Sequence, residues 1–364
     1  MLEVADIVRL HGDEYRTKFG SQLTAVQKKA LRDIQNCRTP FFGGHVYQCD
    51  HCDEKRYSYH SCRNRSCPKC HHDQTEHWIA QQRQRLLPCP YYLITFTLPA
   101  ALRPLARSHP KIVYGLLIKA AADALQKLAA DPRFLGARLG ILAVLHTWTR
   151  AMLYHPHVHM LVTAGGLSFD GGHWVEPKNP RFLVPVRALS VIFAAKMCAA
   201  LKKAGLLDQS PSDVWKKAWV VHCQHAGSGE KVLDYLGRYV FRMAITNNRL
   251  ETIHDGQVTF RYRDNRTKCV MHATLSAVEF LYRFMQHVLP RRCTKVRYYG
   301  IFSPHCHRQL DQARARIPTS LNPAPPLPVP SNPSTNPPLG RCPYCHVGKL
   351  VLLSTLRPLR SRSP

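Results

Sequence analysis

Histidines alternate with other residues in a short segment near the middle of the chain, and their spacing is suited to metal binding. Residues 155–162 read His-Pro-His-Val-His-Met-Leu-Val. On a β-strand alternate side chains share one face, so His157 and His159 would point the same way while Val158 turns into the core. Two imidazoles on one rigid face are half of a divalent-metal site.

A third imidazole is expected from the strand that precedes this pair. Residues 139–149 are also strand-like, and a short connection would join them to residues 155–163 as an antiparallel hairpin. With the turn centred in that connection, His146 lies opposite Val158 and within reach of the pair, which would complete a three-histidine site. His155 is on the same face, one step further along, and is the alternative third ligand.

These histidines also have simpler explanations. A lone histidine is more often a surface residue or a hydrogen-bonded core residue than a ligand. Two histidines at i and i+2 on an apolar strand, with a third on the neighbouring strand, favour a metal site instead. The pattern leaves the metal and its chemistry open, because amidohydrolase-type metalloenzymes also place His-x-His on a strand.

Two tyrosines four residues apart follow in the same region. Residues 230–242 have a helical pattern, so Tyr235 and Tyr239 would lie one turn apart on one face. A protonated phenol is a poor nucleophile, with a pKa near 10, but a nearby divalent cation can polarise a scissile phosphate. Arg238 and Arg242 are placed to hold phosphates. Such a tyrosine pair is more often core packing, and it gains weight here because a candidate metal site precedes it.

Cysteines near the N-terminus form two Cys-x-x-Cys pairs, which predict a structural zinc site made by Cys49, Cys52, Cys67 and Cys70. Four thiolates around zinc can fold a segment too small to bury its own core. A second zinc could use the remaining ligands of this segment: Cys37, His45, His60 and Cys62. Basic side chains in the same module predict DNA contacts, namely Arg63, Arg65 and Lys69. The alternative is a zinc knot that serves only stability or protein contacts.

A further Cys-x-x-Cys pair, Cys342 and Cys345, lies in the C-terminal tail and lacks an obvious second pair. His305, Cys306 and His307 are no more than candidate partners, so this pair stays unassigned.

Charge points to a polyanionic partner. The 364 residues include 51 Lys and Arg against 23 Asp and Glu, a formal net charge of +28. Neutralised phosphates release counterions on binding, so nucleic acid is the first partner to consider, with a ribosome-associated or membrane-surface protein as the alternative. The N-terminus lacks a signal-peptide pattern, and no run of about twenty apolar residues is present, so we expect a cytoplasmic, nucleoid-associated protein without a membrane span. Cysteine pairs beside histidines suit a reducing compartment.

The order of expected elements indicates an α+β fold. Around the hairpin the sequence predicts strands and helices at residues 91–98, 103–130, 186–204, 219–224 and 230–242. Helices packed on an antiparallel sheet would result. Composition divides the chain into an N-terminal helix and zinc module (1–85), a central domain (90–303), a proline-rich linker (317–338) and a basic tail (339–364).

The ordered motifs resemble the insertion-sequence-91 family of rolling-circle transposases. The resemblance covers most of the chain up to about Phe302 and rests on linked segments: residues 37–39, 60–70, 146–148, 155–159, 165–167, the Tyr-x-x-x-Tyr helix, 240–247, 279–290 and 298–300. It implies a HUH-endonuclease domain, an antiparallel sheet with packed helices of the ferredoxin or RRM kind. It also implies cutting and rejoining of single-stranded DNA at the transposon ends and target.

By position, the resemblance makes His157 and His159 ligands of Mg²⁺ or Mn²⁺, and makes Tyr235 and Tyr239 the nucleophiles that form 5′-phosphotyrosine links. His146 as third ligand is an inference from hairpin geometry. This chain has Thr-Arg after Trp148 where many relatives have Gly-Gln, which puts in doubt any ligand role for a glutamine there.

Three other functions share some of these features. A plasmid or phage replication initiator or relaxase would use the same chemistry, but the zinc module and the absence of a helicase P-loop favour a transposase. A non-enzymatic, zinc-dependent DNA-binding regulator would leave the histidines and tyrosines incidental. A metal-dependent hydrolase of small molecules gives no reason for the charge of +28.

Overall fold

The computed structural model describes residues 2–70, 72–179, 182–230, 233–234, 237, 243–264, 266–318, 321 and 340–359. They form two compact units, each built from separate stretches of chain. One, here called the cysteine unit, takes residues 1–74, 245–288 and 326–364, and the other, the sheet unit, takes 75–244 and 289–325. This division differs from the consecutive domains expected from composition, because residues 245–288 return to the N-terminal unit.

The sheet unit is organised around an antiparallel sheet in the order β12-β4-β5-β3-β8. Its strands are β3 (Pro90–Thr97), β4 (Gly140–Trp148), β5 (Tyr154–Thr163), β8 (Val221–Ser228) and β12 (Val296–Gly300). The expected hairpin is β4 and β5, and the expected strand at 91–98 is β3. The expected α+β class with an antiparallel sheet is confirmed.

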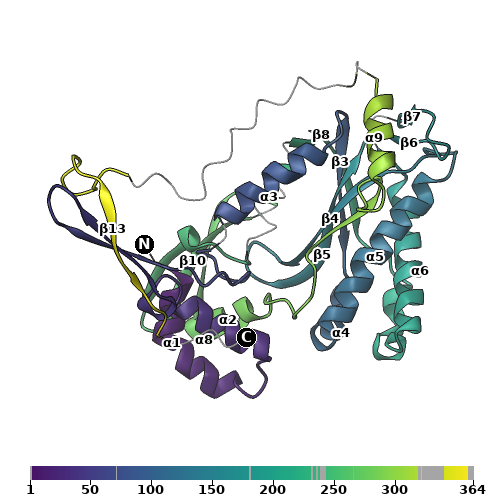
Figure 1. Ribbon diagram of the computed structural model, residues 1–364. Coiled ribbons are helices and arrows are strands. Elements are labelled where there is room, and N and C mark those ends of the chain that lie inside the picture. Colours follow the sequence, from purple (N-terminus) through teal and green to yellow (C-terminus); the bar gives the residue numbers. More distant parts are fainter. Residues whose placement is uncertain are drawn as a thin grey trace. The chain divides into compact units, whose positions relative to one another are not determined.

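Helices cover one face of this sheet. They are α4 (Arg103–Ser108), α5 (Pro110–Ala129) and α6 (Val186–Lys203), and α5 and α6 lie side by side against the strands (Figure 1). Their core includes fully buried Phe96, Val158 and Phe193. The single helix expected at 103–130 is two helices, because Pro110 lacks an N–H and disfavours helical geometry at the residue before it.

The opposite face is covered over part of its area. Leu142, Val144 and Leu161 of the sheet form a second core with side chains of α3 (His72–Arg85) and α9 (His307–Arg316). The two short strands β6 (Gly166–Leu167) and β7 (Trp174–Val175) pair beside α9. The histidines lie on this second face, beyond the part that the second core occupies.

The cysteine unit holds two small sheets and three helices among the residues described. Its sheets have the orders β13-β1-β2 and β11-β10-β9. Its elements are α1 (Val4–Phe19), α2 (Ala25–Gln35), β1 (Gly44–Cys49), β2 (Lys55–Tyr59), β9 (Leu250–His254), β10 (Gln257–Arg263), β11 (Val270–Ser276), α8 (Ala277–Met285) and β13 (Leu350–Leu356). Tail strand β13 pairs with β1 near the N-terminus (Figure 1).

Short 3-10 turns complete the described elements: η1 (Pro40–Phe42), η2 (Ala100–Leu102), η3 (Leu207–Gln209), η4 (Ser212–Trp215) and η5 (Asn247–Arg249). Among the helices described here, none combines the length and the apolar character needed to span a bilayer.

Candidate functional site

Three histidines converge on the partly covered face of the sheet. His146 in β4 lies directly opposite His157 in β5, and His159 is two residues further along the same strand. One ligand nitrogen from each lies within 4.8 Å of the other two. His146 is buried, and the other two side chains are partly exposed. The hairpin therefore brings together the three imidazoles that the sequence predicted as a set.

The register of the hairpin differs from the expected one by one residue. The sequence analysis placed His146 opposite Val158, but Leu145 occupies that position, and an irregularity between His146 and Trp148 absorbs the difference. Directly opposed residues of an antiparallel pair share a face, and a one-residue slip turns a side chain to the other face. The observed register is thus the one that puts His146 with the other histidines rather than in the core.

Hydrogen bonds orient two of the rings. The Nδ1 atom of His157 donates to the backbone oxygen of His155 at 2.7 Å, because a carbonyl oxygen can only accept. Its Nε2 atom therefore keeps the lone pair that a metal needs. The Nδ1 atom of His159 bonds the hydroxyl of Thr95, on the adjacent strand β3, at 2.9 Å.

His155 has a different role in this geometry. A terminal nitrogen of Arg103 lies 2.7 Å from its Nδ1 atom. A guanidinium can only donate, so this Nδ1 atom accepts and the Nε2 atom carries the proton. In the part of the chain that the structure describes, His155 is absent from the cluster of close ligand atoms, so the structure favours His146 over it as the third member.

Burial keeps all three imidazoles neutral at physiological pH. It lowers the pKa of His157 to about 4 and that of His159 to about 3. Burial also lowers the pKa of His146 well below its ordinary value, with a further contribution from the other two histidines and from Lys295. Only a neutral imidazole binds metal, so protons compete little for this cluster near pH 7.

The predicted tyrosines Tyr235 and Tyr239, and the predicted phosphate contacts Arg238 and Arg242, lie outside the described residues. Between residues 231 and 242 the structure describes only 233, 234 and 237, and two of these contact α3. Leu233 is fully buried, and Asp234 forms an ion pair of 2.8 Å with Arg83. A Cβ atom on Gly237 would come within 2.5 Å of the Ile79 side chain, which explains a glycine in a helical segment.

Two clusters of four cysteines occur among the residues described, both in the cysteine unit. One joins Cys37, Cys62, Cys67 and Cys70, and the other joins Cys49, Cys52, Cys342 and Cys345. Their sulfur atoms are 3.3 Å apart for Cys37 and Cys70 and 3.7 Å apart for Cys49 and Cys345, and all these cysteines are free thiols. Four sulfurs at such spacing suit tetrahedral zinc.

This geometry corrects the predicted ligand sets. Cys49 and Cys52 do not share a site with Cys67 and Cys70, because β13 pairs with β1 and carries the tail cysteines to the first pair. The signal in the sequence was the unassigned tail pair, whose partners proved to be 290 or more residues away along the chain. Backbone N–H groups of Gly348 and Val347 lower the pKa of the Cys345 thiol to about 6, which favours the thiolate that zinc binds.

The other predicted ligands of a second zinc divide between two places. Cys37 and Cys62 belong to the first cluster, whereas His45 and His60 lie outside both. Their rings are in edge contact with centroids 4.9 Å apart. Among the predicted DNA contacts, Arg63 and Arg65 are exposed, while Lys69 forms an ion pair of 2.8 Å with Glu3.

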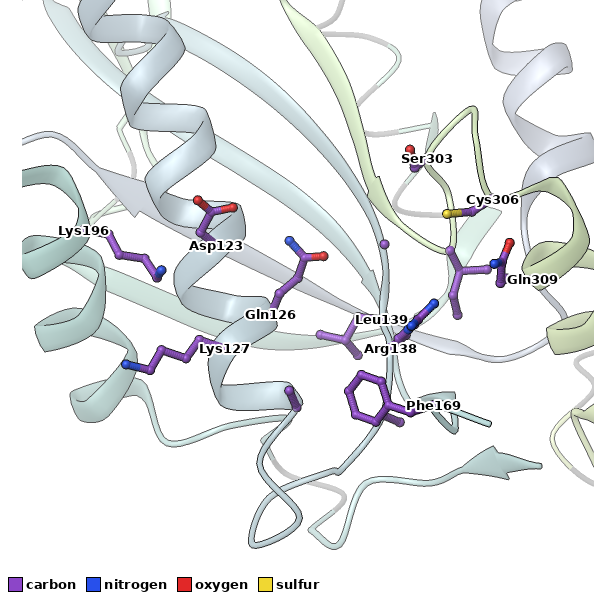
Figure 2. A pocket seen from close by; sticks show the side chains of 14 residues that line it. Asp123, Gln126, Lys127, Arg138, Leu139, Phe169, Lys196, Ser303, Cys306 and Gln309 are labelled. Carbon is purple, nitrogen blue, oxygen red and sulfur yellow. The ribbon is translucent and has the colours of Figure 1, made fainter. Parts of the chain in front are cut away.

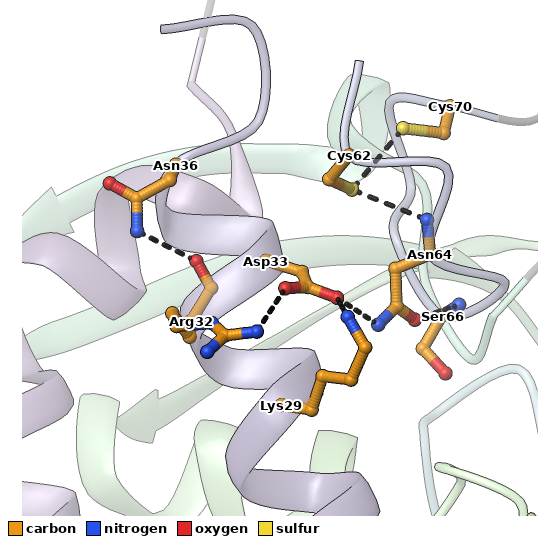
Figure 3. A network of polar contacts seen from close by, with 8 residues as sticks. All are labelled: Lys29, Arg32, Asp33, Asn36, Cys62, Asn64, Ser66 and Cys70. Carbon is orange, nitrogen blue, oxygen red and sulfur yellow. Dashed lines mark hydrogen bonds and ion pairs between the residues drawn. The ribbon is translucent and has the colours of Figure 1, made fainter. Parts of the chain in front are cut away.

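A buried carboxylate holds the loop of the first cysteine cluster against α2. Asp33 is 1% exposed and accepts hydrogen bonds from Lys29 and from the side chain of Asn64, at 2.7 and 2.8 Å (Figure 3). Asn64 in turn accepts from the backbone of Ser66 and donates its own N–H to the Cys62 sulfur. The network fixes the loop between two of the cysteine ligands.

Sequence reasoning missed the residues that surround the histidines. Thr95 orients His159, Arg103 bonds His155, and Lys295 lies 4.6 Å above the ring of Trp148, which stacks on His146. The alternation of β3 could have placed Thr95 on the histidine face. The other two come from segments whose approach depends on the fold.

Two family models match the chain. "Transposase zinc-binding domain" matches residues 7–98, and "Putative transposase" matches residues 140–310. The chain is 40% identical to "Putative transposase y4qJ" of Sinorhizobium fredii, over 96% of this chain and 94% of that protein. It is 30% identical to "Transposase for insertion sequence element IS801" of Pseudomonas savastanoi pv. phaseolicola, over 84% and 78%.

The chain belongs to the insertion-sequence-91 family of transposases. Its partner is therefore DNA, its activity includes DNA cleavage, and it has a zinc-binding domain, for which the cysteine clusters offer suitable ligands. No solved structure matches the transposase significantly.

The two cysteine clusters predict two zinc ions per chain. Replacing Cys342 with Ser should reduce the content to one, since it removes a ligand of the tail cluster and leaves the other cluster intact. Cys269→Ser is the matched control, because Cys269 is exposed and outside both clusters. Zinc per chain is measured by native mass spectrometry, and two zinc ions in Cys342→Ser would contradict the assignment.

The Asp33 network predicts a stability effect. Asn64→Ala leaves a buried carboxylate short of one hydrogen bond, which should cost about 1–3 kcal/mol. Asn36→Ala removes an exposed bond at the end of the same helix and should cost less. Urea unfolding followed by circular dichroism measures the free energy of unfolding of both variants. Equal decreases would contradict a larger contribution of the buried network to stability.

Proposed function

We propose that this transposase nicks and rejoins single-stranded DNA through 5′-phosphotyrosine intermediates, with Tyr235 and Tyr239 as nucleophiles, in rolling-circle transposition. The observation that carries the proposal is the convergence of three neutral imidazoles from one β-hairpin on a partly covered sheet face. An antiparallel sheet with helices on the other face is the arrangement expected of a HUH-endonuclease domain.

The donor set fits a divalent transition metal. His146, His157 and His159 offer only nitrogen ligands, which suit Mn²⁺ better than Mg²⁺, a cation that prefers oxygen. When bound, the cation would polarise the scissile phosphate and offset the negative charge that develops there. Thr95 and the backbone of His155 hold two of the ligand rings in position.

Cationic groups beside the histidines suit a phosphate backbone. Arg103 fixes His155 so that its Nε2 atom carries a proton, an N–H that can donate to a phosphate oxygen. Lys295 is close enough to His146 to lower the pKa of that ring. Basic side chains of this strongly basic chain therefore lie beside the place where a DNA strand would be cut, where they can attract its phosphates.

The reaction balances without an external energy source. A tyrosine oxygen attacks phosphorus, the bond from phosphorus to the 3′-oxygen breaks, and the phenolic proton is lost while the leaving oxygen gains one. The new phosphotyrosine ester conserves the energy of the phosphodiester, so a 3′-hydroxyl can attack it and rejoin DNA without ATP. Two tyrosines allow one to hold a donor end while the other attacks a second junction.

A covalent adduct is the direct test. With Mn²⁺ and single-stranded oligonucleotides of the element's ends, the transposase should form a protein–DNA adduct that survives denaturing electrophoresis. The adduct should disappear in the Tyr235→Phe/Tyr239→Phe double variant and persist in Tyr57→Phe, a control at an exposed tyrosine of the cysteine unit. DNA retardation without any adduct would instead support a non-enzymatic regulator.

The hydrogen bond from Thr95 predicts a metal-dependent defect. Thr95→Val removes the partner that orients His159, which should weaken Mn²⁺ affinity about 10- to 100-fold. Raising the Mn²⁺ concentration should then restore adduct formation, whereas His157→Ala should not be rescued in this way. His254→Ala, at an exposed histidine of the cysteine unit, is the control. A Thr95→Val defect that Mn²⁺ fails to rescue would argue against this role.

A further inference from the structure

A pocket of about 620 Å³ opens in the sheet unit beside residues 138 and 139, where β4 begins. His146 lies near the other end of this strand. The lining of the pocket comes from the C-terminal half of α5, from α6, from the ends of β4 and β12, from the turn after β6 and from the start of α9 (Figure 2). Gly140 and His146 are six residues apart in β4, which corresponds to ~20 Å. The pocket is therefore separate from the site proposed to cut DNA.

An exposed aromatic ring forms one wall. Phe169 is 54% exposed, although a phenylalanine normally buries most of its ring. Its turn is rigid, because the Asp170 carboxylate accepts from Ser168 and from the backbone of Gly172, and the Ser168 hydroxyl accepts from the backbone of His173. The ring is thus held at the surface instead of folding into the core.

Positive charge lines the pocket on two sides. The guanidinium of Arg138 lies 5.5 Å from the ring centroid of Phe169. Lys127 and Lys196 line the side of the pocket formed by α5 and α6, with Gln126 between them and Phe169 (Figure 2). The acidic lining residue, Asp123, is in an ion pair of 2.6 Å with Lys119.

We propose that this pocket binds one unpaired nucleotide of the single-stranded DNA, with the base stacked on Phe169 and phosphates held by Arg138, Lys127 and Lys196. A flat ring beside cations is how proteins hold single strands without reading their sequence. Gln126, Ser303 and Gln309 add polar groups to the lining that can hydrogen-bond any base.

This inference rests on the proposed function, because the bound nucleotide belongs to the strand that the histidine site cuts. At ~20 Å from the histidines, the pocket would hold that strand away from the scissile phosphate. It would therefore contribute to binding and positioning and leave the chemical step to the histidine site.

The test compares two single-stranded probes in the Tyr235→Phe/Tyr239→Phe background, where no cutting can occur. One probe is an oligothymidylate, and the other has the same length and phosphates but only abasic sites. Phe169→Ala should weaken binding of the oligothymidylate about tenfold and leave binding of the abasic strand unchanged. Lys127→Gln should weaken binding of both probes, since it acts on phosphates.

Matched variants control for surface and folding effects. Phe182→Ala alters a 42% exposed phenylalanine outside the pocket, and Lys203→Gln alters an exposed lysine on α6, so neither should change affinity. Thermal unfolding checks that each variant is folded. Photocrosslinking with an iododeoxyuridine-substituted strand should label the peptide that contains Phe169.

Equal affinities of Phe169→Ala and Phe182→Ala for the oligothymidylate, or a Phe169→Ala loss that persists on the abasic strand, would overturn the proposal. Either result can occur while the tyrosine-intact protein still forms covalent adducts, in which case only the pocket assignment fails. Base-dependent binding through Phe169 in a protein that never forms an adduct would instead support the pocket and contradict the proposed cutting chemistry.

Discussion

The pairing of β4 with β5 is the constraint on which the histidine site depends. Backbone hydrogen bonds fix His146 opposite His157, and because opposed residues share a face, the register alone decides that three imidazoles meet. Val158 and Leu145, on the other face, are completely buried against the helices. Slipping the pair by one residue would expose these apolar side chains and bury a histidine, so core packing and ligand geometry enforce the same register.

The cysteine unit depends on a different kind of constraint. One of its two three-stranded sheets pairs β13 with β1, and the cluster of Cys49, Cys52, Cys342 and Cys345 joins the same two parts of the chain. Sheet pairing and the cysteine cluster therefore connect the same two distant segments of the chain. In the other cluster, buried Asp33 and Asn64 position the loop that carries the ligands. Zinc supplies stability that so small a core lacks.

The net positive charge of the chain and the side chains held in fixed positions both suit a nucleic-acid partner. The excess of 51 basic over 23 acidic residues gives general attraction to phosphates, but attraction alone gives no geometry. In the functions proposed above, geometry would come from individual groups that the scaffold holds in place: Arg103 against His155, Lys295 beside the stacked Trp148, and Phe169 on a hydrogen-bonded turn. Under these proposals, attraction and positioning would be contributed by different residues.

The sequence by itself determined the local features of this transposase: the alternation that puts His157 and His159 on one face, the strands of the hairpin, the helical segments, and the cysteine pairs that indicate zinc. These follow from periodicity and ligand chemistry within a few residues. Only the tertiary structure decided which distant residues complete each site. The hairpin irregularity chose the register of His146, and the pairing of β13 with β1 chose the second half of a zinc site. Both outcomes depend on contacts between distant segments, whose free energies a local pattern does not encode.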